Sequence, residues 1–244
     1  MVVNRVDQNF PELNKYRKGV ALIIAGTEEY PGAAVLTVGA ARRGGAGYIK
    51  YLSKYLSPRE LVIQNFPDVV PIRSLRNQRF DAIVMGPGNA IFKKIPNNVP
   101  IVLDAKAIKE IYRFNNPIKI ITPHTGEAET LGFKVANKRT AAIEIANKTN
   151  SICVLKGHNT TVATPNGKVW IDKLGGDELA TAGTGDLLAG LIGSMIAAAK
   201  PGDLNAAFKI VCAAVTRHSK AGKAAKRKYK VVTALDVLEA LKTN

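Results

Sequence analysis

Short, continuous apolar runs recur along the chain and alternate with segments that have a helical pattern. The runs are rich in valine and isoleucine, which is typical of strands buried on both faces of a parallel sheet. They occupy residues 20–26, 60–65, 81–86, 100–105, 118–124 and 151–157. Helical patterns lie between them at 33–43, 127–131 and 140–149. This alternation predicts an α/β protein with a mostly parallel central sheet and helices on both of its faces.

The pattern changes after residue 160. Residues 160–173 contain two short β-like runs around Asn166-Gly167, a dipeptide typical of tight hairpin turns. We therefore expect antiparallel strands at one edge of the sheet. Three helical patterns complete the chain, at 187–199, 204–222 and 234–242. No linker rich in serine, glycine or proline divides the sequence, so we expect residues 1–244 to form a single domain.

The cysteine content and the apolar segments bear on the cellular location of the protein. Cys153 and Cys212 are the only cysteines, and they offer neither a disulfide framework nor a metal-binding C-x-x-C spacing. The longest apolar stretch, Leu187 to Ala199, is too short to cross a bilayer, and residues 1–19 lack the apolar core of a signal peptide. We therefore expect a cytoplasmic protein that makes no membrane contact.

The formal net charge of +16 permits nucleic acid, an acidic membrane surface or a polyanionic small molecule as a partner. The densest basic run is KAAKRKYK at 223–230, which contains one aromatic residue. A solvated helix end explains this run better than a binding site for a phosphate backbone does. We therefore expect small-molecule anions rather than nucleic acid.

Residues suited to ligand binding follow directly after several predicted strands. These segments are GTEEYPGA (26–33), GPGN (86–89), DAK (104–106), TPHTGE (122–127) and KGHNT (156–160). The carboxyl ends of parallel strands meet at one edge of a sheet, where α/β proteins bind their ligands. The sequence therefore predicts that these scattered segments converge in space.

The segment AGTGDLLAG (182–190) places Gly183 and Gly185 beside Asp186 at the start of a predicted helix. Glycines and free helix amides form an anion-binding site, and Asp186 beside it would serve as a general base for phosphoryl transfer to a hydroxyl. Asp186 as a simple helix cap is the alternative. A dinucleotide fingerprint fits less well because no strand directly precedes these glycines, and no P-loop motif occurs in the chain.

The chain resembles a known family through several motifs taken together. They are AGTGDLLAG with the preceding ELAT, and TPHTGE, VLKGHNT, GPGN, YPGA and RRGGAG. Their order and spacing resemble the ribokinase-like enzymes that dehydrate hydrated NAD(P)H, the NAD(P)HX dehydratases, from about Lys18 to Asp236. The resemblance implies a three-layer αβα sandwich. It also implies that ATP or ADP phosphorylates the hydroxyl of the hydrated nicotinamide ring, after which phosphate leaves and NADH or NADPH is restored.

The resemblance also implies roles for individual residues. Asp186 would accept the hydroxyl proton and contact the substrate, together with Ala33, Gly88 and His124. The nucleotide would bind to Lys156, Gly157, His158, Asn159, Thr160, Gly183, Thr184 and Gly185. From the residues alone, a structural hydrogen bond is the commoner role for a histidine such as His124. A helix cap explains Glu127 as well as any functional role does, and a tight turn is the alternative for Gly88.

Cofactors and partners follow from the same reaction. We expect Mg²⁺ to accompany the nucleotide, although the sequence contains no recognisable metal-binding set of its own. We also expect a separate NAD(P)HX epimerase in the same pathway and a homo-oligomer, for example a tetramer. Two other functions stay open: a ribokinase-like kinase of a vitamin precursor such as hydroxymethylpyrimidine or hydroxyethylthiazole, and an RNA-binding protein. The chain departs from the usual family motifs at Asn89, Ala90, Lys106 and Thr125 and in GGDELAT.

Overall fold

The computed structural model describes residues 17–242, and within them the central feature is a nine-stranded sheet. The strands lie in the order β3-β2-β1-β4-β5-β6-β7-β8-β9. All neighbours from β3 to β7 are parallel, whereas β8 and β9 are antiparallel to their neighbours. The strands span Val20–Ile24 (β1), Tyr48–Leu52 (β2), Val70–Ile72 (β3), Ala82–Met85 (β4), Ile101–Leu103 (β5), Lys119–Ile121 (β6), Ile152–Leu155 (β7), Thr161–Ala163 (β8) and Val169–Ile171 (β9).

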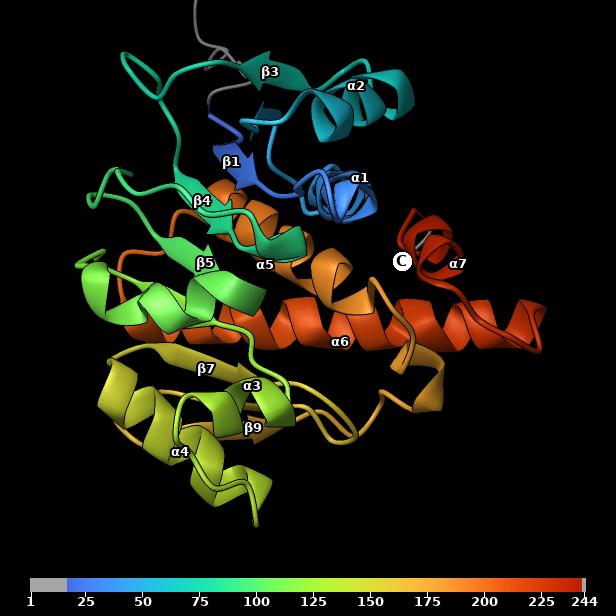
Figure 1. Ribbon diagram of the computed structural model, residues 1–244. Helices are drawn as coiled ribbons and strands as arrows, with labels where there is room; N and C mark the ends of the chain where they lie inside the picture. The colour runs from blue at the N-terminus through green and yellow to red at the C-terminus, as the bar shows by residue number, and fades with distance from the viewer. Residues whose placement is uncertain (1–16, 243–244) are drawn as a thin grey trace, which may run out of the picture.

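Helices cover both faces of this sheet (Figure 1). Their bounds are Pro31–Ala41 (α1), Leu56–Asn65 (α2), Thr125–Thr130 (α3), Lys138–Thr149 (α4), Thr184–Ala199 (α5), Leu204–Lys228 (α6) and Ala234–Ala240 (α7). Three 3-10 helices span Pro87–Asn89 (η1), Ala105–Arg113 (η2) and Asp177–Leu179 (η3). Buried side chains of α1, α5, α6 and α7 share one apolar core, and those of η2, α3 and α4 share the other. The predicted α/β sandwich of three layers is therefore confirmed.

Strand β1 shows why the buried strands have no alternation of apolar and polar residues. Ala21 and Ile23 belong to the core beneath α1 and α5, whereas Val20, Leu22 and Ile24 belong to the core on the opposite face. All five side chains are fully buried. Because helices exclude water from both faces of the sheet, both sets of positions must be apolar.

One predicted strand is wrong. Residues 60–65 form the second half of helix α2, where Pro58 and Val62 are buried one turn apart while Glu60 and Gln64 are exposed. A short run such as ELVIQN is compatible with both a strand and one face of a helix, and the packing of Val62 against the sheet decides for the helix.

Strand β1 lies between β2 and β4, and of these two neighbours the hydrophobic pattern predicted β4 but not β2. The β2 sequence YIKYL is interrupted by Lys50, which makes it unlike the other apolar runs. Lys50 is nevertheless buried, and its ammonium group donates to the Gln78 side chain (2.8 Å) and to the Arg79 carbonyl (3.1 Å). The charge is accommodated because these oxygens replace water.

The C-terminal half follows the predictions more closely. Strands β8 and β9 form the expected hairpin around Asn166-Gly167, with Ala163 paired to Val169. Helix α6 runs on to Lys228, so the basic run at 223–230 is a mostly exposed helix end. No helix within residues 17–242 is both long and apolar enough to cross a lipid bilayer. The expectation about a signal peptide falls mostly on residues outside those described.

Candidate functional site

Helix α5 begins at the carboxyl edge of the sheet and brings its first turn into the candidate site. It starts at Thr184, three residues earlier than predicted, so Gly185 and Asp186 lie inside the first turn. The N-cap residue is Gly183, with a φ of +92° that favours glycine. A Cβ atom there would also lie 2.4 Å from Leu36 Cδ1. Within residues 17–242 no side chain caps this helix, so the amides of Gly185 and Asp186 remain available to an anion.

The carboxylate of Asp186 lies in a cluster of four charged side chains. Lys156, at the end of β7, is placed over the first turn of α5, since a Cβ atom on Gly185 would lie 3.2 Å from its Nζ. The same Nζ is 2.8 Å from Asp104 Oδ1 and 3.7 Å from Glu127 Oε2. Segments after β5, β6 and β7 thus meet at the start of α5, as the sequence predicts for the carboxyl edge.

The pKa values in this cluster follow from burial and from the neighbouring charges. Burial raises the pKa of Asp186 to about 7; repulsion from Asp104 adds to the rise, and Lys156 opposes it. Burial alone would lower the pKa of Lys156, but attraction to Asp104 and Glu127 outweighs it and leaves that pKa raised. Lys156 is therefore a permanent cation beside a carboxylate that exchanges its proton near neutral pH, as a general base requires.

The alternative that Asp186 only caps its helix is weakened by the geometry. Asp186 is the third residue of α5, and its carboxylate accepts no hydrogen bond from residues 17–242. Asp203 and Thr233, in contrast, cap α6 and α7 with their side chains. Among the described residues, Asp186 is therefore not used as a side-chain cap.

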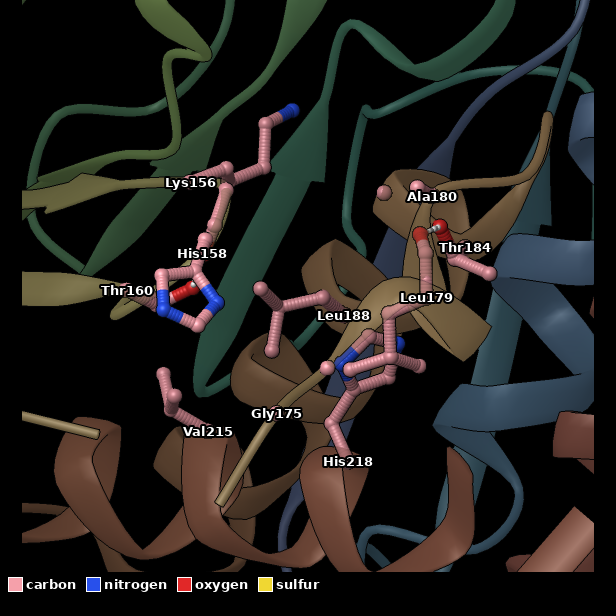
Figure 2. Close-up of a pocket in the computed structure, with 13 residues that line it drawn as sticks. Lys156, His158, Thr160, Gly175, Leu179, Ala180, Thr184, Leu188, Val215 and His218 are labelled. Atoms are coloured by element: carbon pink, nitrogen blue, oxygen red, sulfur yellow. Dashed lines mark hydrogen bonds between the residues drawn. The ribbon is translucent and has the colours of Figure 1, made fainter. Parts of the chain in front are cut away.

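A cavity of about 110 Å³ lies beside this cluster (Figure 2). Lys156, His158 and Thr160 approach it from one side, Leu179, Ala180 and Thr184 from the other, and Val215 and His218 from α6. Six of the eight residues predicted for the nucleotide line it, namely Lys156, Gly157, His158, Thr160, Thr184 and Gly185. The apolar side chains at its centre suit a flat base, and the lysine suits phosphate.

The other two predicted nucleotide residues, Asn159 and Gly183, shape the backbone next to the cavity. Asn159 has a φ of +55° in the turn after β7, and Gly183 begins α5. Lys138 of α4 holds that turn from behind by donating to the carbonyl oxygens of Lys156 (3.0 Å) and His158 (2.8 Å). Asn159 and Gly183 therefore determine the backbone conformation beside the cavity and do not line it.

The residues predicted for the substrate fall into two groups. Gly88, with a φ of +61°, packs directly on α1, since a Cβ atom there would lie 2.7 Å from the Cβ atom of Ala33. The close approach by itself explains a small residue at both positions. Helix η1, which contains Gly88, contacts α5 as well as α1. The strands that precede Ala33 and Gly88, β1 and β4, are separated in the sheet from β7, which precedes Lys156, by β5 and β6.

His124 forms the other group, at the start of α3. Its Nδ1 accepts from the Glu127 amide (3.2 Å), and Glu127 Oε2 accepts from the His124 amide (2.8 Å), which is a capping box. The predicted helix cap by Glu127 is thus present. The imidazole remains 59% exposed, so it is also open to a ligand.

The sequence assigned no role to two residues of the site, although it placed Asp104 in one of the segments expected at this edge. Asp104 is buried, accepts from Thr122 Oγ1 (2.5 Å) and pairs with Lys156, but its position directly after β5 was the only signal in the sequence. His218 lies in an alanine-rich helix, where nothing marks it. Its buried Nε2 has no partner among residues 17–242, and burial lowers the pKa of His218 to about 4, so the imidazole is neutral at pH 7.

The described residues contain no metal site of their own. Within residues 17–242, no group of three or more histidine, cysteine or carboxylate side chains is placed to hold an ion. Asp104 and Glu127 are the carboxylates nearest to Lys156, and both already face its ammonium group. This arrangement fits Mg²⁺ only as an ion that phosphate groups bring with them and that keeps most of its waters.

Comparisons with known proteins agree on one family. The sequence profile described as NAD(P)H-hydrate dehydratase matches residues 21–243. The chain is 32% identical to the ADP-dependent (S)-NAD(P)H-hydrate dehydratase of Bacillus subtilis over 208 residues, covering 76% of this chain and 75% of that protein. It is 31% identical to the bifunctional NAD(P)H-hydrate repair enzyme of Mycobacterium tuberculosis, covering 78% of this chain but 43% of that protein. The chain thus spans less than half the length of such bifunctional relatives.

Solved structures extend the agreement to the fold. The crystal structure of an ADP/ATP-dependent NAD(P)H-hydrate dehydratase from Bacillus subtilis, co-crystallized with ATP and Mg²⁺, matches with a TM-score of 0.81 and 26% identity, covering 97% of this chain and 92% of that chain. A ribokinase-like superfamily protein from Enterococcus faecalis matches with a TM-score of 0.78 and 22% identity, covering 97% and 89%. The ribokinase-like architecture is therefore confirmed.

Proposed function

Because the chain belongs to the NAD(P)H-hydrate dehydratase family, we propose that it uses ATP or ADP to dehydrate hydrated NADH and NADPH (NADHX and NADPHX). In this proposal the hydroxyl of the hydrated ring attacks the terminal phosphorus of the nucleotide and displaces ADP from ATP, or AMP from ADP, while Asp186 takes the hydroxyl proton. The C–O bond then breaks with phosphate as the leaving group. A ring carbon next to it gives up a proton, which restores the double bond of the nicotinamide ring.

The observation that carries this proposal is the placement of Asp186 in the first turn of α5, in one charged cluster with Lys156. The amides of that turn and the cavity of about 110 Å³ offer a site for the nucleotide. Ala33 and Gly88 lie in α1 and η1, which both contact α5, and these small residues would leave room for the hydroxyl substrate. A nucleotide phosphate and a substrate hydroxyl bound in this way would meet at the carboxylate.

Lys156 and the amides of α5 would stabilise the negative charge that develops on the transferring phosphoryl group. Mg²⁺ bound to the nucleotide would neutralise further charge on the phosphates, with Asp104 and Glu127 as the nearest carboxylates. The raised pKa of Asp186 suits this role, because it makes the carboxylate a stronger base than that of an ordinary aspartate.

The direct test is the recovery of absorbance at the wavelength of the reduced nicotinamide from purified NADHX or NADPHX. We expect recovery only when ATP or ADP is present, and loss of recovery when Mg²⁺ is chelated. Phosphorylation of hydroxymethylpyrimidine or hydroxyethylthiazole, with no recovery of NADH, would instead assign the chain to the vitamin-precursor kinases.

A further inference from the structure

Two further cavities lie along the same edge of the sheet, on the side away from the candidate nucleotide cavity. The first, of about 330 Å³, lies between η2 and α3 and is lined by Lys106, Lys109 and Glu127 among others. The second, of about 200 Å³, is lined by Lys54 and Tyr55 after β2 and by segments after β1 and β4. Asn89 and Lys106 line both, so the two cavities adjoin one another. We call them together the edge groove.

The edge groove starts at the charged cluster and runs away from it. Glu127, which lines the first cavity, is 3.7 Å from Lys156, whereas Lys54 is found only in the second cavity. Glu127 follows β6 and Lys54 follows β2, and four strand spacings of about 4.8 Å separate these strands, roughly 19 Å in all. This length accommodates an extended dinucleotide whose reactive ring lies at Asp186.

The charge of the groove is almost entirely positive. Among the described residues, the side chains of Lys106 and Lys109 form no ion pair and no hydrogen bond, and both are exposed. Lys54 is placed over the ring of Phe92, at 4.7 Å from its centroid. The one carboxylate in the lining, Glu127, already faces Lys156 and caps α3. Lys106 and Lys109 are therefore free to bind phosphate groups, and the contact of Lys54 with a ring face leaves N–H donors of its ammonium group for a phosphate as well.

We propose that the edge groove binds the diphosphate and the adenosine half of the dinucleotide, and that it selects NADPHX over NADHX. Lys106, shared by both cavities, would hold the diphosphate that the two substrates have in common. Lys54, at the far end, would pair with the 2′-phosphate that only NADPHX carries. This assignment follows the order of groups in the dinucleotide and rests on the proposed function, since it requires the ring to lie at Asp186.

The test compares kcat/KM for NADPHX and NADHX in the wild type and in three variants. We expect the wild type to prefer NADPHX, and Lys54→Ala to lower kcat/KM for NADPHX about tenfold while changing that for NADHX little. Lys106→Ala should lower both by a similar factor. Lys168→Ala, beside the β8–β9 turn at the opposite edge of the sheet, is the matched control and should change neither.

Binding of the products NADPH and NADH, measured by calorimetry, separates this inference from the proposed function. If no form of the protein dehydrates either substrate, the proposed function fails. A weaker binding of NADPH to Lys54→Ala with unchanged binding of NADH would still support the groove. An equal effect of Lys54→Ala on both dinucleotides, or an effect no larger than that of Lys168→Ala, would overturn the assignment of the 2′-phosphate.

Discussion

Replacing Asp186 by asparagine is expected to abolish dehydration while leaving nucleotide binding intact. The amide has nearly the same shape but cannot accept the hydroxyl proton, and removal of a general base commonly slows a reaction about a hundredfold to ten-thousandfold. The first amides of α5 and Lys156 are retained, so ATP should bind at least as tightly as in the wild type. The rate of NADH recovery and the calorimetric Kd for ATP measure the two effects separately.

The protonation of Asp186 adds two expectations. Because its pKa is raised to about 7, the wild-type rate should rise with pH through that value, while any residual rate of Asp186→Asn should lack this step. The folded state holds this proton more tightly than the unfolded chain, so the wild type loses stability as pH rises from about 4 to about 7. Asparagine has no such loss, and Asp186→Asn should melt higher than the wild type at pH 8.

A capping role for Asp186 predicts a different result. Asparagine is about as good as aspartate at helix N-termini, so rate and stability would both survive the substitution. Retention of most of the rate by Asp186→Asn would therefore rule out Asp186 as the base.

Replacing Lys156 by methionine is expected to impair both folding stability and nucleotide binding. The substitution leaves Asp104 buried and unpaired, and loss of one partner of a buried pair typically costs about 3 to 5 kcal/mol. It also removes the cation that lowers the pKa of Asp186, so the base would be protonated to a higher pH. Urea unfolding and ATP calorimetry give the two readouts.

The double variant Asp104→Asn with Lys156→Met separates these effects. Asparagine still accepts the hydrogen bond from Thr122 but carries no charge, so much of the lost stability should return. Nucleotide binding should not return, because the ammonium group is still missing. If Lys156→Met binds ATP as tightly as the wild type does, Lys156 contributes only to the structure of the site.

The hydrophobic pattern predicts most of the sheet because both of its faces are dry. Strands such as β1 and β7 are wholly apolar and stand out from their surroundings. Strand β2 was missed because Lys50 interrupts it, and only tertiary contacts with Gln78 and Arg79 make a buried lysine acceptable there. The error at residues 60–65 has the opposite cause, since a short apolar run fits one face of a helix equally well.

The candidate site was predictable to the extent that its residues follow strands. Lys156 and the segment containing Glu127 come directly after β7 and β6, and parallel strands bring such positions to one edge. The sequence carries no comparable signal for contacts between different loops. The pairing of Asp104 with Lys156, and the arrival of His218 from the distant helix α6, depend on how the helices pack on the sheet.

The fate of the hydroxyl oxygen of the hydrated ring tests most directly whether this hydroxyl is phosphorylated. If the ring hydroxyl is phosphorylated before it leaves, NADHX that carries ¹⁸O in this hydroxyl must transfer the label to inorganic phosphate, one labelled phosphate for each NADH restored. Mass spectrometry of the phosphate formed with ATP measures this ratio. We expect the label in phosphate; its appearance in water instead would contradict phosphorylation of the hydroxyl and the role proposed for Asp186.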